Sequence, residues 1–479
     1  MPQKKQQMRQ LTREEFQDAL KKGLGRAVQH VRNSPPEAVR EDLAHACTQY
    51  LGMNLQDELG GRVPWLFRMI EVTGEFDFYR QKVIEAIEQM PDNPDDAETF
   101  NELFGLLAEF AARGDSEILE IMRRRFDSAC VLYEPNFGFD DLYRLDGFDA
   151  LLRLLRREWK RICDDEELVA DDYEIRIAEE DLGKDAVQAA LDEAARGDES
   201  VRLYLERMNR QQRALKAERA ARKRIKKEKV APPSLRELID DQENDWPTEA
   251  EWTNESFRAA FLSRRNQFLH IGRSYAKPTP EELEYALQKL LETTDPGWQF
   301  CLLGIFVKET MPRLEPRLLS LLDSPLQTLQ WGAEQAISRV ADSAVREKGL
   351  ELIAKGPEFQ DWHLGIGLLE KNFQSGDELI LLEKLESISP DVDIHDLHTV
   401  GMTILDLAAA NPEAPLEPHL LWIYEKTYCP HCRCRSVEYM IQRHIAPQHL
   451  LEECLDDSYQ YMRELIQNLT TESPTHDTR

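Results

Sequence analysis

Apolar residues recur along this chain at helical spacing in short blocks, and Gly, Pro or Asn-Pro signals separate the blocks. Thr12 and Glu15 have the spacing of a capping box at the start of the first block. The first block, between residues 11 and 33, carries Phe16, Leu20, Leu24, Ala27, Val28 and Val31. Similar blocks cover about 37–51, 62–73, 76–90, 96–113 and 115–128. Each block predicts a short amphipathic helix that cannot bury its apolar face alone, so the helices must pack on one another.

The composition favours helices over sheets. Ala, Leu, Glu, Arg and Gln dominate, and runs of β-branched residues are scarce. A chain of 479 residues with 42% hydrophobic content is too long for one compact core. We therefore predict an all-α protein built as several domains or as a repeat array.

A repeat of helix pairs becomes visible in the second half of the chain. A leucine-rich helix from Leu318 leads to Asp323, and a Ser-Pro turn then opens a second helix. The second helix carries Trp331, Ala333, Ala336, Ile337 and Val340. Comparable helix–turn landmarks recur near Lys355-Gly356-Pro357, Ser389-Pro390, Tyr428-Cys429-Pro430 and Leu455-Asp456. Their separations of about 30 to 40 residues are typical of HEAT or armadillo arrays.

The segment 318–340 resembles a HEAT repeat, and the resemblance to this superfamily covers roughly residues 280–470. It implies an α-solenoid of stacked helix pairs in the C-terminal half. It implies no functional residue, because HEAT repeats share packing positions rather than a site. The sequence also departs from the family pattern, since Trp331 stands where an Arg often follows the turn. The short helix hairpins of the N-terminal half predict a second, more divergent helical-repeat domain.

These patterns predict five parts of the chain. The expected parts are a disordered N-terminus at 1–10, an N-terminal helical-repeat domain at 11–202, a basic helix with an acidic linker at 203–245, a HEAT-like α-solenoid at 246–470 and a disordered tail at 471–479. Pro232-Pro233 should stop the basic helix, and the acidic stretch through Asp245 is typical of a linker.

The net charge, the short apolar runs and the scattered cysteines favour a cytoplasmic location. The formal net charge of −29 opposes binding of the body of the protein to nucleic acid or to anionic membranes. The N-terminal residues have no apolar stretch typical of a signal peptide. The longest apolar run, 300–307, is too short to span a membrane. Eight scattered cysteines indicate reduced thiols, so we expect a cytoplasmic protein without membrane contact.

One segment has the opposite charge to the rest of the chain. Between Arg207 and Lys229 there are 11 basic residues and 2 acidic ones. The candidate partner- or phosphate-binding residues are Arg207, Arg210, Arg213, Lys216, Arg219, Arg222, Lys223, Arg224, Lys226 and Lys227. A long helix here could follow a phosphate backbone. It could equally be a solvated helix, or it could dock on the acidic surface of the protein itself.

Cysteines and histidines near the C-terminal end suggest a structural zinc site. Cys429, Cys432, His444 and His449 come close to zinc-finger spacing. The alternative is that the cysteines fill the core beside an interhelical turn. A helix over 432–443 would also place His444 roughly 18 Å from Cys432, which argues against a shared metal.

A second cluster contains Asp391, Asp393, His395, Asp396 and His398. These side chains could bind a divalent metal if the segment were an extended loop. Alternatively, Asp391 or Asp393 caps a helix that begins near residue 394, and both histidines lie near its start.

The sequence carries no nucleotide-binding, metallohydrolase, serine-hydrolase or kinase motif. We therefore predict a non-catalytic scaffold or adaptor without a cofactor, apart from the candidate zinc. Its acidity would suit a basic protein partner. The alternative is a nucleic-acid-associated subunit that contacts phosphates through residues 207–229.

Overall fold

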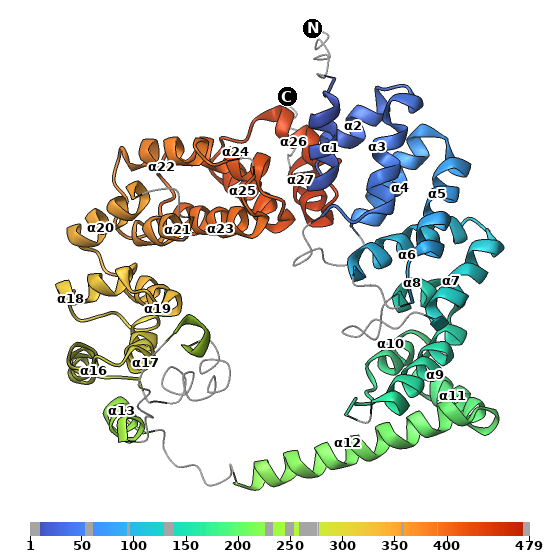
Figure 1. Cartoon of the computed structure of the whole chain (residues 1–479), viewed down its shortest axis with the longest axis horizontal. Helices are drawn as coiled ribbons and strands as arrows, with labels where there is room; N and C mark the ends of the chain where they lie inside the picture. The colour runs from blue at the N-terminus through green and yellow to red at the C-terminus, as the bar shows by residue number, and fades with distance from the viewer. Residues whose placement is uncertain are drawn as a thin grey trace, which may run out of the picture. The chain divides into compact units, whose positions relative to one another are not determined.

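A computed structural model shows that the chain is helical. It describes residues 10–52, 61–92, 96–128, 138–165, 167–225, 233–244, 253–257, 275, 277–355, 359–389 and 391–472. Within these residues every regular element is a helix, which confirms the all-α prediction (Figure 1). No helix among them combines the length and the apolar character that crossing a membrane requires.

The chain divides into two compact units. Unit 1 contains residues 1–229 and 447–479, and unit 2 contains residues 230–446. This division differs from the expected one, because 447–470 was assigned to the C-terminal solenoid but groups with the N-terminal helices. The chain therefore leaves unit 1, forms unit 2, and returns to unit 1.

Unit 1 is a succession of helices in which α2, α4, α6 and α8 each contact the next. Its helices are α1 (Arg13–Lys22), α2 (Gly25–Arg32), α3 (Pro36–Thr48), α4 (Arg62–Thr73), α5 (Phe76–Gln89), α6 (Ala97–Ala111), α7 (Ser116–Ser128), α8 (Phe139–Asp146), α9 (Phe148–Asp164), α10 (Tyr173–Leu182), α11 (Lys184–Gly197), α12 (Glu199–Ile225), α26 (Gln448–Cys454) and α27 (Gln460–Glu472). The bounds of α3 to α7 agree with the expected blocks to within three residues at each end.

The first expected helix is correct at its start and wrong in its length. The Thr12 hydroxyl accepts from the Glu15 N–H at 3.2 Å, and the Glu15 carboxylate accepts from the Thr12 N–H at 2.8 Å, as a capping box requires. The helix then ends at Gly23, whose φ of 74° lies in the left-handed region. A second helix starts at Gly25 and continues the same apolar spacing. The break at Gly23 therefore divides the predicted block into α1 and α2.

The end of the chain packs directly on its beginning. α26 lies beside α2 (Figure 1). A Cβ atom on Gly25 would lie 1.9 Å from the carbonyl oxygen of Glu453, so the two backbones approach as closely as glycine allows. The Glu453 carboxylate pairs with Arg26 at 2.7 Å, and the Ser458 N–H donates to the Gly23 carbonyl at 2.8 Å.

Asp456 connects this C-terminal segment to two N-terminal helices. Its carboxylate pairs with Arg32 of α2 at 2.7 Å and with Arg68 of α4 at 2.9 Å. Its backbone carbonyl accepts from the buried indole N–H of Trp65 at 2.9 Å. Residues 448–472 are therefore part of the N-terminal core.

Unit 2 contains a row of helices, α17, α19, α21, α23 and α25, in which each contacts the next. α16 packs on α17, α20 on α21, and α24 on α25. The helices are α13 (Leu235–Asn244), α16 (Pro280–Glu292), α17 (Pro296–Phe306), α18 (Pro316–Leu319), the 3₁₀ turn η2 (Ser320–Asp323), α19 (Gln327–Ile337), α20 (Ser343–Ala354), α21 (Phe359–Leu368), α22 (Asp377–Glu386), α23 (Ile394–Ala410), α24 (Glu417–Lys426) and α25 (Pro430–Gln442).

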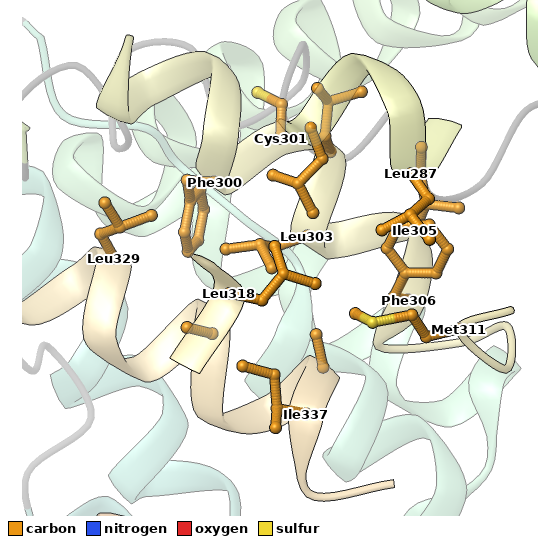
Figure 2. Packing of buried hydrophobic residues seen from close by; sticks show 14 of the residues in the cluster. Leu287, Phe300, Cys301, Leu303, Ile305, Phe306, Met311, Leu318, Leu329 and Ile337 are labelled. Atoms are coloured by element: carbon orange, nitrogen blue, oxygen red, sulfur yellow. The ribbon is translucent and has the colours of Figure 1, made fainter. Parts of the chain in front are cut away.

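The apolar run 300–307 lies mostly in α17, at the centre of a core cluster of unit 2. Figure 2 shows Phe300, Leu303 and Phe306 of this helix among side chains from α16, α18 and α19. Leu303 and Phe306 are fully buried. A helix that is apolar around most of its circumference is expected inside a domain, where every face finds an apolar neighbour.

The acidic stretch expected as a linker is partly a helix. α13 covers 235–244, and its Leu235 and Ile239, four residues apart, are both fully buried in the same core cluster. The Tyr285 hydroxyl on α16 donates to Asp240, and the Lys289 ammonium pairs with Glu243 at 2.6 Å. The acidic side chains thus bind α16 while the apolar pair packs inward. Residues 245–252 and the proline stop at 232 lie outside the described residues.

The ends of α21, α23 and α25 repeat one polar contact. Asn372 follows α21, and its side-chain amide donates to the carbonyl of Val340, just beyond α19, at 2.9 Å. Asn411 follows α23 and donates in the same way to a carbonyl just beyond α21, also at 2.9 Å. Arg443 follows α25 and donates to the carbonyl of Ala408 near the end of α23, at 2.6 Å. The residue after each of these three helices therefore satisfies a carbonyl at or just beyond the end of the preceding helix of the row.

The close approach at Gly25 gives a test of how the C-terminal segment is held. Gly25→Ala should lower the free energy of unfolding of unit 1 by about 1–3 kcal/mol, because a backbone carbonyl blocks the new methyl group. Hydrogen exchange should also become faster in α26 and α27, whereas α9 to α11 should be little affected. Denaturant unfolding and residue-resolved hydrogen exchange measure the two effects.

Gly197→Ala is the matched control. Gly197 ends α11 in the same unit, and a Cβ atom there meets nothing within 4 Å. This variant should be neutral or slightly stabilised, because alanine favours the helix. Equal stability of the two variants would contradict the assigned docking of α26 on α2.

Candidate functional site

The predicted basic helix is real, and its first half is part of the fold of unit 1. α12 is the long helix of Figure 1. Tyr204 is buried and donates to the Asp171 carbonyl at 3.1 Å. The Arg207 guanidinium donates to the Leu168 carbonyl at 2.9 Å. Arg207, which we expected to contact a partner, therefore helps to hold the segment before α10.

The second half of α12 has a different environment. Every residue from Arg213 to Ala220 is exposed, including Lys216, Arg219 and the apolar Leu215. Arg210, at the transition, is also exposed. Three of the predicted residues, Arg222, Lys223 and Arg224, lie on the helix, but their side chains are outside the described set, and Lys226 and Lys227 lie outside the described residues altogether.

Two of the four predicted zinc ligands lie close together. Cys429 is the N-cap of α25, and Cys432 lies in its first turn. The third donor beside them is His398 of α23, and one ligand atom from each residue lies within 4.8 Å of the other two. The Cys432 sulfur is 3.4 Å from Nδ1 of His398. His398 belongs to the second sequence cluster, so the fold joins two members of the first predicted cluster to one member of the second.

The surroundings of the two cysteines favour a thiolate at Cys429. The thiol of Cys432 lowers the pKa of Cys429 well below its usual range, burial opposes this shift, and His398 adds to it. The same contact with Cys429, together with burial, raises the pKa of Cys432. Cys301 lies in the apolar core and gives a comparison. There burial has the largest effect on the pKa of the thiol, and it raises that pKa. Cys429 and Cys432 therefore have a polar environment that a core-filling cysteine lacks.

His444 and His449 are not members of this donor group. α25 has 13 residues and is about 20 Å long, and it carries His444 to the end opposite Cys432. His444 has a φ of 59° and lies just beyond the helix end, where it helps to terminate α25. His449 belongs to unit 1, in α26.

Another member of the second sequence cluster, Asp393, caps a helix. The Asp393 carboxylate accepts from the His395 N–H at 2.8 Å and begins α23 at Ile394, which confirms the capping interpretation. Asp391, His395 and Asp396 are not members of the metal-capable donor group found among the described residues.

Three acidic residues of unit 2, Glu334, Glu370 and Asp406, lie in one region that the sequence did not predict, and we call them the acidic row. Glu334 of α19 is 5% exposed and its pKa is raised to about 7, first by burial and then by the charges of Glu370 and Asp406. Gly367 of α21 makes room for it, since a Cβ atom there would lie 2.0 Å from the Glu334 carboxylate. Beside Glu334 on the same helix, Trp331 is 49% exposed. The chain has 89 acidic residues, and no local sequence pattern distinguishes Glu334, Glu370 and Asp406 from the others.

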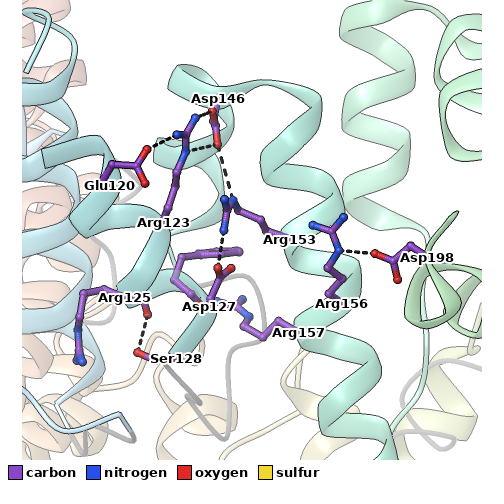
Figure 3. Close-up of polar contacts among 11 residues, drawn as sticks. Glu120, Arg123, Arg125, Asp127, Ser128, Asp146, Arg153, Arg156, Arg157 and Asp198 are labelled. Atoms are coloured by element: carbon purple, nitrogen blue, oxygen red, sulfur yellow. Dashed lines mark hydrogen bonds and ion pairs between the residues drawn. The ribbon is translucent and has the colours of Figure 1, made fainter. Parts of the chain in front are cut away.

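Unit 1 contains a cavity that does not qualify as an anion site. The cavity has a volume of about 380 Å³ and is lined by Glu120, Arg123, Arg124, Asp127, Ser128 and Arg153. Figure 3 shows that Arg123 binds Glu120 and Asp146, and that Arg153 binds Asp127. Arg124 pairs with Glu88. These arginines already have carboxylate partners inside the chain, so the cavity offers little charge to a ligand.

Comparison of the chain with protein-family models, with curated proteins and with solved structures gives no match.

The buried carboxyl of Glu334 predicts a pH-dependent stability. Its folded pKa of about 7 lies above the ordinary value of 4.5, so the folded chain holds this proton more tightly than the unfolded chain. Stability from this group is therefore present below about pH 4.5 and is lost as the pH rises towards 7. Glu334→Gln should stabilise the chain at pH 8 by an amount on the order of 3 kcal/mol, and by much less at pH 5.

Thermal melting of both chains at pH 5 and pH 8 measures this difference. Glu386→Gln, at an exposed position of α22 in the same unit, is the control and should leave the melting temperature nearly unchanged at both values. A Glu334→Gln effect that is the same at pH 5 and pH 8 would show that the carboxyl does not titrate in this range.

Proposed function

We propose that this chain is a non-catalytic interaction scaffold or adaptor of the cytoplasm, and that unit 2 is a HEAT-like α-solenoid. The recurring contact of Asn372, Asn411 and Arg443 with the end of the preceding helix supports the solenoid. Contacts that recur between sequence neighbours are typical of solenoids, in which each repeat packs on the next. The order α17, α19, α21, α23, α25 fits the same pattern.

The acidic row is the observation that carries the proposal of a protein partner. Trp331, Glu334, Glu370 and Asp406 come from α19, from the segment after α21, and from α23. The charges of Glu370 and Asp406 raise the pKa of Glu334, so the three carboxyl groups lie in one region. Asp406 also pairs with Arg435 at 3.2 Å, so its charge is partly offset within the chain. The half-exposed Trp331, three residues before Glu334 on α19, provides the kind of apolar anchor that dominates binding energy at protein interfaces. A basic segment with an apolar residue would match this surface.

Charge reversal in the row tests this surface. Glu370→Lys with Asp406→Lys, or Trp331→Ala alone, should reduce binding of a basic partner at least about tenfold. The full chain is used as bait in its native host extract, and partners are quantified by mass spectrometry. Each partner recovered is then produced alone, and its affinity for the wild type and the variants is measured at fixed salt.

Glu383→Lys with Glu386→Lys is the matched control, because both residues are exposed on α22 and the change in net charge is the same. Melting temperatures check that all variants are folded. A partner set that is unaffected by the row variants would exclude this surface.

The exposed half of α12 favours a second candidate, a nucleic-acid-associated protein. Arg213, Lys216 and Arg219 are exposed on consecutive turns of one helix, and the helix begins in the core of unit 1. Such a helix could contact successive phosphates without reading bases, because no aromatic residue is interspersed among its cations.

A salt titration tests this candidate. The full chain is titrated with a labelled duplex and a labelled single strand, starting at about 50 mM salt, where phosphate contacts are strongest. Arg213→Gln, Lys216→Gln and Arg219→Gln together should reduce the slope of log K against log salt by up to about 3, because about one counterion is released per contact.

The matched control replaces Arg176, Lys184 and Arg196 with Gln, since all three are exposed in unit 1 on α10 and α11. Binding that is undetectable at about 50 mM salt, or equal losses in the two triple variants, would reject this candidate.

A further inference from the structure

We propose that His398, Cys429 and Cys432 bind one Zn²⁺ ion that joins α23 to α25. The three donors come from two neighbouring helices, and an atom from each lies within 4.8 Å of the others. The site goes beyond the proposed scaffold function, and it differs from the zinc-finger set expected from spacing because His398 replaces His444 and His449.

The local structure explains why the cysteines face the same side. Cys429 is the N-cap of α25, and Cys432 lies three residues further on, in the first turn. Residues three apart on a helix are neighbours on one face. α23 packs against α25, and His398 lies near the start of α23, one turn after its Asp393 cap. Two helix starts therefore meet at the donor group.

The distances suit zinc. Zinc binds thiolate sulfur at about 2.3 Å and imidazole nitrogen at about 2.0 Å, so a tetrahedral site separates these two donors by about 3.5 Å. The observed distance from the Cys432 sulfur to Nδ1 of His398 is 3.4 Å. Cys432 and His398 therefore already have the separation of two ligands of one zinc ion, and the Cys429 sulfur lies within 4.8 Å of both.

The charges also suit a soft divalent cation. Cys429 and Cys432 are 0% and 2% exposed, and two buried thiolates without a counter-charge would be costly. One divalent ion neutralises both thiolates. Sulfur and imidazole donors select zinc over magnesium or calcium, which prefer oxygen. His398 is only half-buried, and the three protein donors leave one position of a four-coordinate ion open.

A disulfide between Cys429 and Cys432 is the competing use of the same residues. Two cysteines separated by two residues at a helix start are also typical of redox-active pairs. His398 favours the metal, because its Nδ1 lies 3.4 Å from the Cys432 sulfur, the separation of two ligands of one zinc ion. A disulfide between the two cysteines would not require a histidine at this position. The experiment therefore measures metal content and thiol oxidation together.

The full chain is purified without added metal, and its zinc content is measured by mass spectrometry. We expect about one zinc per chain in the wild type. Titration of the metal-free, reduced chain with Co²⁺ should give thiolate-to-cobalt charge transfer and the visible bands of a tetrahedral site. Removal of zinc by a chelator should lower the melting temperature, and added zinc should restore it.

His398→Ala, Cys429→Ser and Cys432→Ser should each weaken metal binding by at least about tenfold. Cys434→Ser is the matched control, because Cys434 lies on the same helix outside the donor group, and it should keep one zinc. The chelator experiment uses the wild type, so the test holds even if a variant fails to fold. Zinc well below one per reduced chain overturns the proposal. A disulfide between Cys429 and Cys432 in the freshly isolated chain, detected as a loss of two hydrogens from the mass of the denatured, metal-free chain, also overturns it. Equal loss of metal in Cys434→Ser overturns the three-ligand assignment.

Discussion

The contact between the last helices and the first ones is the constraint on which unit 1 depends. The Gly25 backbone meets the Glu453 carbonyl, and the Asp456 carboxylate binds arginines on α2 and α4. The buried indole of Trp65 would lose its acceptor without the Asp456 carbonyl. Unit 1 therefore completes its core only when residues 447–472 are present. Contacts across more than 390 positions close a long loop, which slows folding relative to the local helix pairs.

The sequence predicted the elements where the controlling interactions are local. The capping box of Thr12 and Glu15 and the cap at Asp393 involve residues two or three apart, and both appear where they were expected. α4 likewise ends at the expected Thr73, where Gly74 has a φ of 71° and terminates the helix. Where the outcome depended on distant packing, local pattern was not enough. α13 looked like a linker because its surface is acidic, and its buried pair, Leu235 and Ile239, has meaning only against α16 and α17.

The candidate metal site shows the same limit for function. His398 precedes Cys432 by 34 positions, and only the packing of α23 on α25 brings them together. Zinc-finger spacing instead selected His444, which the helix itself carries to its far end. The acidic row is a similar case. Glu334, Glu370 and Asp406 are ordinary acids in the sequence, and only the order of α19, α21 and α23 places them in one region.

The distribution of charge separates the two candidate surfaces. In unit 1 arginines bind carboxylates on neighbouring helices, as Arg80 does with Asp115 at 2.6 Å and Arg156 with Asp198 at 2.5 Å. Such pairs fix helix against helix, whereas Lys216 and Arg219 lie exposed on the part of α12 beyond its packed half. Their charge is therefore available to a partner at little cost to the fold.

The acidic row in unit 2 has the opposite sign, and it contains Glu334, whose raised pKa leaves its carboxyl partly protonated near pH 7. A cation near Glu334 would lower its pKa and recover an ionised carboxylate, so binding of a basic partner there should release a proton near pH 7. A polyanion on α12 has no such buried carboxyl to ionise, and proton release on binding therefore distinguishes the two surfaces even where both respond to salt.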